Sequence, residues 1–296
     1  MNPNTMILPL LLAIITICHS QPLSIWINNT ANPSHPDGSQ ENPYTSFSDA
    51  YNNKILSTLT TDDVIVIFAA TNKPYSVSIT LSDTQLNHAL SLTSNIVFSQ
   101  DPTLDCNTVP TIEMPDGLSI ASENLTIAFS WLNLNFQNSN KAVPINIQTE
   151  NLLKITITNL CIYHSSSASI SSIMNVNSSG QSIVNMANIN VQFDMSSTQN
   201  FATQNLFLIN SCSSCNSDSI FTASNFSFSG DLSHINSNRN PLTLFSIKGE
   251  NIITVNDVTM NNLPSALPII LTDLDGEDSP YAYSLNFEDI IIKNSW

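Results

Sequence analysis

Apolar residues alternate with other residues along much of the chain, and one version of this pattern recurs six times between residues 125 and 294. Each copy has two apolar residues at alternate positions, a central residue, and two further apolar residues at alternate positions. Alternation of this kind predicts β-strands with one buried face. The central residues, spaced 28 to 37 residues apart, are Trp131, Asn159, Asn188, Asn225, Asp257 and Asp289.

The alternation slips by one position at each central residue. In a straight strand this slip would send every later side chain to the opposite face of the sheet. A bend at the slip would keep the apolar side chains inside. Asn and Asp tolerate the left-handed backbone conformation that a one-residue bend requires. We therefore predict a bend at the central residue.

A further apolar run follows most copies and predicts a third strand. Three short strands and three bends in about 30 residues form one coil of a solenoid, and stacked coils bury the faces that one coil cannot. The sequence thus predicts an all-β solenoid over residues 61–296. The additional runs are Val143 to Ile147, Leu206 to Leu208, Leu242 to Leu244 and Leu267 to Leu271.

Residues 21–60 are predicted to cover the first coil. A short strand is expected at Ile25 to Ile27, and Ser46 with Asp49 forms a capping box for a helix that ends near Leu56. Such a helix would cover the apolar end of the stack. Early strands are then expected at Val64 to Phe68, Tyr75 to Ile79, Leu90 to Leu92 and Ile96 to Phe98.

The bend pattern resembles the right-handed parallel β-helix of the pectin lyase-like superfamily. The N-terminal run Asp37-Gly38-Ser39-Gln40-Glu41-Asn42-Pro43-Tyr44, followed by Ser46 to Ala50, is similar to the segment that leads into the first coil of many such proteins. The resemblance covers nearly the whole chain after residue 20 and implies a capping helix. It does not imply an activity, because this fold hosts lyases, hydrolases, adhesins and inert scaffolds.

The two ends of the chain carry separate expectations. Residues 1–20 are predicted to be a secretory signal peptide, with a 13-residue apolar run from Met6 to Cys18. No later segment has the length of apolar sequence that a membrane span needs. The sixth copy comes shortly before Trp296, so we expect either that the chain is the N-terminal part of a longer surface protein or that Trp296 folds back as a plug.

Composition fits an exported protein with a weakly charged surface. Charged residues make up 10% of the chain, and 7 Lys and Arg stand against 23 Asp and Glu, for a net charge of −16. This charge argues against nucleic-acid partners and against polyanions such as pectate.

Four cysteines follow residue 20, and an even number in an exported chain predicts disulfides, with three connectivities. Cys212 and Cys215 lie in a Ser-rich stretch, where we expect a local disulfide rather than a redox pair or a zinc site. The other two candidates are Cys106 and Cys161.

Four sequons predict N-linked glycans at Asn28, Asn124, Asn177 and Asn225. The first three are expected at loops or bends. Asn225 occupies the bend column, where neighbouring side chains could hold it. For each sequon the alternative is an unmodified Asn in a turn.

Groups that could carry chemistry are sparse, and no catalytic residue, metal or cofactor is predicted. Arg239 is the single arginine, and no recognisable motif surrounds His35, His88, His164 or His234. The acidic run from Asp273 to Asp278 favours a solvated loop over a calcium site, because it lacks the spacing of a calcium-binding loop. Asp62 and Asp63 are interpreted as the polar start of a strand.

These patterns favour a secreted or cell-surface glycoprotein that serves as a structural or adhesive module. Carbohydrate or other surface proteins are the expected partners, and the outer strand faces should carry mostly Asn, Ser, Thr and Gln. The acidic run should lie on an exposed loop, away from Arg239 and the histidines. The alternative is a carbohydrate-active enzyme, a lyase or hydrolase with degenerate motifs, for which the support is analogy of fold.

Overall fold

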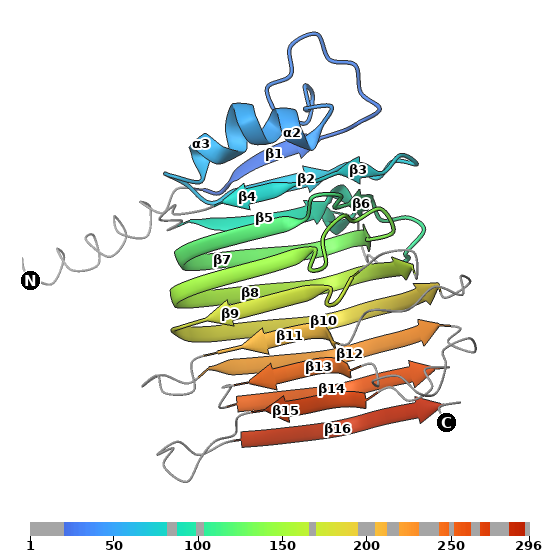
Figure 1. Cartoon of the computed structure of the whole chain (residues 1–296). Helices are drawn as coiled ribbons and strands as arrows, with labels where there is room; N and C mark the ends of the chain where they lie inside the picture. Colours follow the sequence, from blue (N-terminus) through green and yellow to red (C-terminus); the bar gives the residue numbers. More distant parts are fainter. Residues whose placement is uncertain are drawn as a thin grey trace, which may run out of the picture.

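The chain forms an all-β parallel β-helix with a short N-terminal helix, as the sequence predicted (Figure 1). The computed structural model describes residues 21–81, 88–98, 104–165, 170–194, 205–211, 219–230, 243–248, 252–261, 267–272 and 284–293. The predicted signal peptide, residues 1–20, and Trp296 lie outside the described residues.

In the described residues sixteen strands belong to one continuous sheet, in which the strand pairs are parallel. The strands are β1 (Leu23–Ile27), β2 (Val64–Phe68), β3 (Tyr75–Ser76), β4 (Ile79–Leu81), β5 (Ala89–Ser94), β6 (Thr111–Glu113), β7 (Leu118–Asn135), β8 (Ile145–Ser165), β9 (Met174–Ser178), β10 (Gln181–Asp194), β11 (Asn205–Asn210), β12 (Ile220–Gly230), β13 (Thr243–Lys248), β14 (Ile252–Asn261), β15 (Leu267–Thr272) and β16 (Ser284–Lys293).

Strand β8 shows how one coil is built. Its residues 145–149 pair with the start of β7 and with β9, whereas residues 152–158 and 160–165 pair with β10 on either side of a bend. The same three segments recur along the stack. In β8 the first segment is residues 145–149, the second is residues 152–158 and the third is residues 160–165. We call the outward side-chain positions of these three segments, in every coil, the first, second and third faces.

The bend falls at the residue that the sequence predicted. The six central residues all have a left-handed backbone, with φ between 50° and 55°. Two hydrogen bonds between side-chain amides link consecutive coils here, because Asn188 donates to Oδ1 of Asn159 and Asn225 donates to Oδ1 of Asn188. Each amide thereby stabilises the same bend in the coil beside it.

Trp131 is the exception in this column, because a bulky side chain is rare at positive φ. Its φ is 55°, and its side chain is 8% exposed. It packs in a small second core with Val109 and Cys161, outside the main core. Burial of this large aromatic surface compensates for the unfavourable backbone conformation.

The main core consists of columns of inward side chains that stack from coil to coil. Val191 lies in register between Ile162 and Phe228, and each of the three is the third residue after its bend, so the alternation places all three on the same side. The column extends to Leu134 and Met260, and none of its five side chains is more than 3% exposed. One coil alone would leave these side chains in water, so each coil depends on its neighbours.

The predicted helix covers one end of the stack (Figure 1). It runs as α2 (Phe47–Ala50), a π-helical turn (Tyr51–Ile55) and α3 (Leu56–Thr58), two residues beyond the predicted end. Ser46 Oγ accepts a hydrogen bond from the Asp49 backbone at 3.1 Å, which confirms the capping interaction. Phe47, Ala50 and Ile55 are buried in the main core.

The loop before this helix depends on Gly38, which has a φ of 82°. A Cβ at this position would lie 3.0 Å from the Tyr44 ring and 3.2 Å from Ile25, so a larger residue would be both strained and crowded. Ser39 donates its backbone N–H to Asp37 at 2.8 Å, and hydrogen bonding by Ser39 holds the pKa of Asp37 below its ordinary value.

Three strand predictions need correction. Residues 96–98 are not a strand but part of a 3₁₀ turn (Asn95–Phe98), in which Ser94 Oγ accepts from the Ile96 backbone at 3.0 Å. In β11 the inward column contains Phe207 and Ile209, whereas Leu208 is paired with the outward Ser246. Because residues 206–209 are all apolar, the sequence pattern does not show which of them point inward. Strands β11 and β15 form where the third apolar runs predicted them, whereas β13 begins at Thr243 and extends to Lys248, beyond the predicted run from Leu242 to Leu244.

Candidate binding surfaces

The first face carries stacked amide side chains. Asn175 donates to Oδ1 of Asn146 at 3.1 Å, and Asn210 donates to Oδ1 of Asn177 at 2.8 Å. The second pair continues in register to Gln148 on one side and to Lys248 on the other. An amide both donates and accepts, so the amides of each column offer repeated hydrogen-bonding groups at the spacing of the strands, and Lys248 adds a charge at one end of the second column.

The second face carries a similar column of hydroxyl and amide groups. Within this column Thr222 donates to Oδ1 of Asn185 at 2.7 Å, which links two coils. Two residues farther along the strands, Ser130 donates to Oγ1 of Thr93 at 2.9 Å. The column in register is Ser91, Ala128, Thr156, Asn185, Thr222, Thr254 and Asn286.

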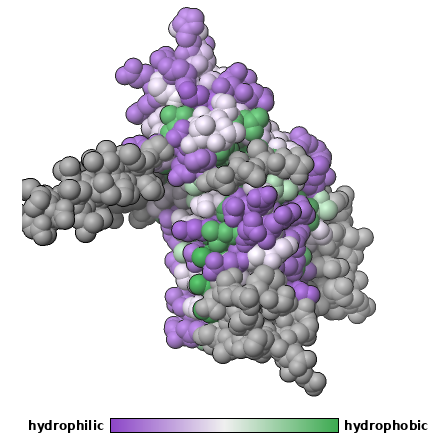
Figure 2. Space-filling model, turned by 90° about the vertical axis from the view of Figure 1, so that its left-hand side faces the viewer, coloured by the Kyte–Doolittle hydropathy of each residue, from purple (hydrophilic) through white to green (hydrophobic). Residues whose placement is uncertain are grey.

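An aliphatic column that was not predicted from the sequence runs beside it. Ile183, Ile220 and Ile252 are in register on the second face, and all three are partly exposed. Each lies five residues before its bend, so counting back from the bend would have identified an outward position. Figure 2 shows hydrophobic patches among mostly hydrophilic atoms on one side of the stack.

A disulfide holds a loop over the beginning of the third face. Cys106 is bonded to Cys161 of β8, with 5.5 Å between the Cα atoms. Asn133 donates to the Cys106 carbonyl at 3.3 Å, and Asn190 donates to Cys106 Sγ at 3.7 Å. Of the three predicted connectivities, this pairing is the one that leaves Cys212 and Cys215 to form the expected local disulfide. Cys212 and Cys215 lie outside the described residues.

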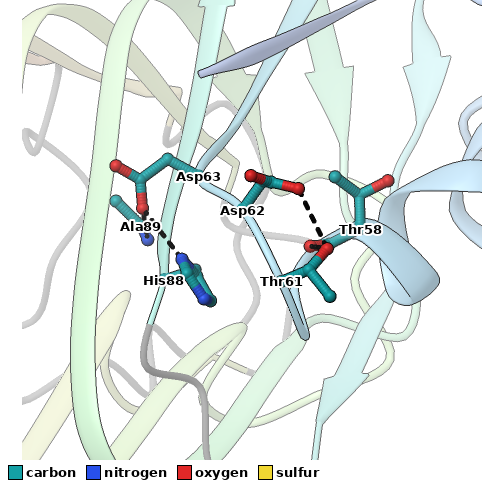
Figure 3. A network of polar contacts seen from close by, with 6 residues as sticks. All are labelled: Thr58, Thr61, Asp62, Asp63, His88 and Ala89. Atoms are coloured by element: carbon teal, nitrogen blue, oxygen red, sulfur yellow. Dashed lines mark hydrogen bonds and ion pairs between the residues drawn. The ribbon is translucent and has the colours of Figure 1, made fainter. Parts of the chain in front are cut away.

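Five of the described aspartates, Asp37, Asp49, Asp62, Asp63 and Asp105, accept hydrogen bonds in turns and caps. In Figure 3, Asp62 and Asp63 point toward different partners. Asp62 accepts from Thr61 Oγ1 at 3.0 Å, whereas Asp63 accepts from the Ala89 backbone at 2.8 Å and lies 3.6 Å from His88 Nδ1. This agrees with the interpretation of the two aspartates as the polar start of β2. Because the two side chains point in opposite directions, their carboxylates do not form a pair.

The histidines described lie in different surroundings. His35 is exposed, and His88 lies beside Asp63 at the start of β5. His164 is completely buried in β8, next to Phe193 with 6.0 Å between the ring centroids, and burial lowers its pKa to about 4. His234, Arg239 and residues 273–278 lie outside the described residues, so their predicted separation stays a prediction.

The four sequons occupy different kinds of position. Asn28 follows β1 and accepts through Oδ1 from Thr30, whereas Asn124 lies at an irregularity of β7. Asn177 is in strand β9, not in a loop as expected. Asn225 is exposed, and its amide donates to Asn188 as anticipated for the bend column. Glycosylation of these residues stays a prediction.

Comparison with family models, curated proteins and solved structures finds no match. Among the residues that the structure describes, no three His, Cys, Asp or Glu side chains come close enough together to hold a metal ion. No helix in the described ranges is both long and apolar enough to cross a membrane.

Proposed function

We propose that this chain is an exported surface glycoprotein of the right-handed, pectin lyase-like type of β-helix, and that its outer faces are non-catalytic contact surfaces. Carbohydrates or other surface proteins are the partners that such faces suit. The observation that carries the proposal is the pair of amide columns on the first face, to which we assign carbohydrate binding.

The geometry of the first face supports carbohydrate recognition. Bonds between coils fix the orientation of Asn146, Asn175, Asn177 and Asn210, so little side-chain entropy is lost when a partner binds. Sugars present hydroxyl groups, which require both donors and acceptors. Amides supply both without the desolvation cost of a charge.

The use of the carboxylates in local structure also favours a contact surface over an acid–base site. Asp37, Asp49 and Asp63 each bind a backbone N–H or a hydroxyl close by. General acid–base catalysis instead requires two titratable groups that converge on one substrate atom.

The proposal predicts binding without turnover on a panel of immobilised neutral polysaccharides. Replacing Gln148 and Asn210 with Ala together should weaken binding about tenfold, because each hydrogen bond contributes about 0.5–1.5 kcal/mol. The matched control, Asn185→Ala with Thr222→Ala, removes a bonded pair from the second face and should leave binding unchanged.

The same panel tests the alternative. Reproducible cleavage of any polysaccharide, lost on Asp273→Ala or Asp275→Ala, would replace the contact-surface proposal with the enzyme hypothesis. Binding that is equally weakened by both double variants would refute the assignment to the first face.

Export makes a separate prediction about processing. In a secretory host the chain should lose about 20 residues, the length of a typical signal peptide. It should also carry glycans on at least one of Asn28, Asn124 and Asn177. Treatment with an N-glycosidase should increase its mobility on a gel. An intact N-terminus together with an unshifted band would contradict export.

A further inference from the structure

Three of the four sequon asparagines use the same atom to stabilise the fold. In Asn28, Asn124 and Asn177 the side-chain oxygen accepts a hydrogen bond from another residue, at 2.8 Å to 3.3 Å. Within the part of the chain that the structure describes, Nδ2 of these side chains donates no hydrogen bond. An N-linked glycan is attached to Nδ2, so it leaves the bond made by Oδ1 intact. Asn225 differs, because its Nδ2 donates to Asn188 at 3.2 Å.

Asn177 is the sequon that lies on the first face. It is partly exposed in β9, in register with Gln148 of the coil before and with Asn210 of the coil after. These two neighbours are the residues to which we assign binding by the first face. Adjacent strands are about 4.8 Å apart, so a group attached to Nδ2 of Asn177 stands directly between them.

The other two sequons with this arrangement lie elsewhere on the fold. Asn124 is in register with Leu152, where the second segment of the coil begins. Asn28 directly follows β1, in the part of the chain that is covered by the capping helix. A glycan on either residue would not enter the amide column, and the chain therefore provides its own comparison for Asn177.

A glycan on Asn177 belongs to the class of ligand that we assign to the first face. Its sugars carry the hydroxyl groups that suit the amides of Gln148 and Asn210, and their attachment between these residues gives them a high local concentration. For a short flexible tether this concentration is on the order of millimolar. The bulk of the glycan also hinders the approach of a free polysaccharide. Both effects oppose binding in trans.

We propose that an N-linked glycan on Asn177 masks the amide column of the first face and competes with polysaccharides for it. This inference rests on the proposed function, because it requires both export and carbohydrate binding by the first face. Occupancy of one sequon then sets how strongly the face binds. The fold stays unchanged, since Oδ1 of Asn177 keeps its bond to Asn210.

Ser179→Ala in a secretory host tests the masking. This change removes the acceptor motif of Asn177 but keeps its amide, and Ser179 is exposed, so the circular dichroism spectrum should be that of the unaltered chain. The variant should bind immobilised neutral polysaccharides at least about tenfold more tightly than the unaltered, glycosylated chain, because the contacts of Gln148 and Asn210 become available together.

Thr126→Ala is the matched control. It removes the motif of Asn124, whose glycan would lie away from the amide column, and should leave the affinity at that of the unaltered chain. Mass spectrometry of glycopeptides should find Asn177 occupied in both proteins.

An N-glycosidase applied to the folded, unaltered chain gives a second measurement that does not depend on a variant. Release of the glycan by hydrolysis converts Asn177 to Asp, whose carboxylate still accepts a hydrogen bond from Asn210. The treated chain should therefore gain affinity as Ser179→Ala does.

The outcomes separate the masking from the proposed function. An unoccupied Asn177, or equal affinities of the unaltered chain and Ser179→Ala, would overturn the masking while binding by the first face stands. Equal gains from Ser179→Ala and Thr126→Ala would also overturn it, because the effect would not belong to the first face. If neither Ser179→Ala nor the deglycosylated chain binds, carbohydrate recognition itself is refuted, and the masking with it.

Discussion

Val191→Asp is expected to unfold at least the coils on either side of β10. Val191 is completely buried between Ile162 and Phe228, so the carboxylate would have no partner and no access to water. Burial of an unpaired charge is among the most destabilising single changes, and we expect a loss of at least about 4 kcal/mol. That is a large part of the stability of a typical domain.

Urea unfolding followed by circular dichroism measures this loss, and Gln192→Asp is the matched control. Gln192 is the next residue along the same strand and is exposed on the third face, so the same carboxylate there should change the free energy of unfolding by no more than about 0.5 kcal/mol. Equal damage from the two variants would show that the inward and outward positions of β10 are exchanged.

His164 is expected to make the fold sensitive to mild acid. Burial lowers its pKa from an ordinary 6.5 to about 4, so the folded chain holds this imidazole neutral while the unfolded chain can protonate it. Between these two pKa values the unfolded state binds more protons, and stability therefore falls as the pH falls. The loss attributable to His164 should reach about 3 kcal/mol at pH 4, because one pKa unit corresponds to about 1.4 kcal/mol.

His164→Phe isolates this contribution. The ring of Phe is close in size to imidazole and suits a site beside Phe193, and it cannot be protonated. The free energy of unfolding of this variant should change less between pH 6.5 and pH 4 than that of the unaltered chain. His88→Gln, at a partly exposed histidine, is the control and should keep the steeper dependence. Parallel curves for all three proteins would contradict the assignment.

The bend column was predictable because its cause is local. A one-residue slip in the alternation requires a bend, and the left-handed conformation restricts which residues accept it. Five of the six positions have Asn or Asp, and all six have the expected backbone. From these positions the register of the core follows, including the pair Ile162 and Val191.

The place of the disulfide in the fold was not predictable, because its cause is tertiary. Cys161 occupies an outward position of β8, and its neighbour in space, Cys106, comes 55 residues earlier in an irregular loop. Sequence spacing does not indicate where a loop crosses a face. The 3₁₀ turn at Asn95 to Phe98 was missed for a related reason, since Ile96 packs against the second core around Trp131 instead of pairing in a strand.

The aliphatic column on the second face was not predicted, because the alternation assigns apolar residues to the buried side of a strand and these apolar residues are on the outer side. Ile183, Ile220 and Ile252 each precede an inward residue directly, so they look like the beginning of a core strand. Their outward direction becomes evident when positions are counted from the bend, where the phase of the alternation is fixed.

The pairing of each coil with the coils directly before and after it has a consequence for biosynthesis. Translation releases the N-terminal end first, so the capping helix and the earliest strands can assemble before the later residues exist. Their free edge then serves as a seed, and every new coil of about 30 residues needs to find the edge just completed rather than a distant partner. Truncation from the C-terminal side would shorten such a stack, whereas loss of residues 21–60 would remove the seed from which it grows.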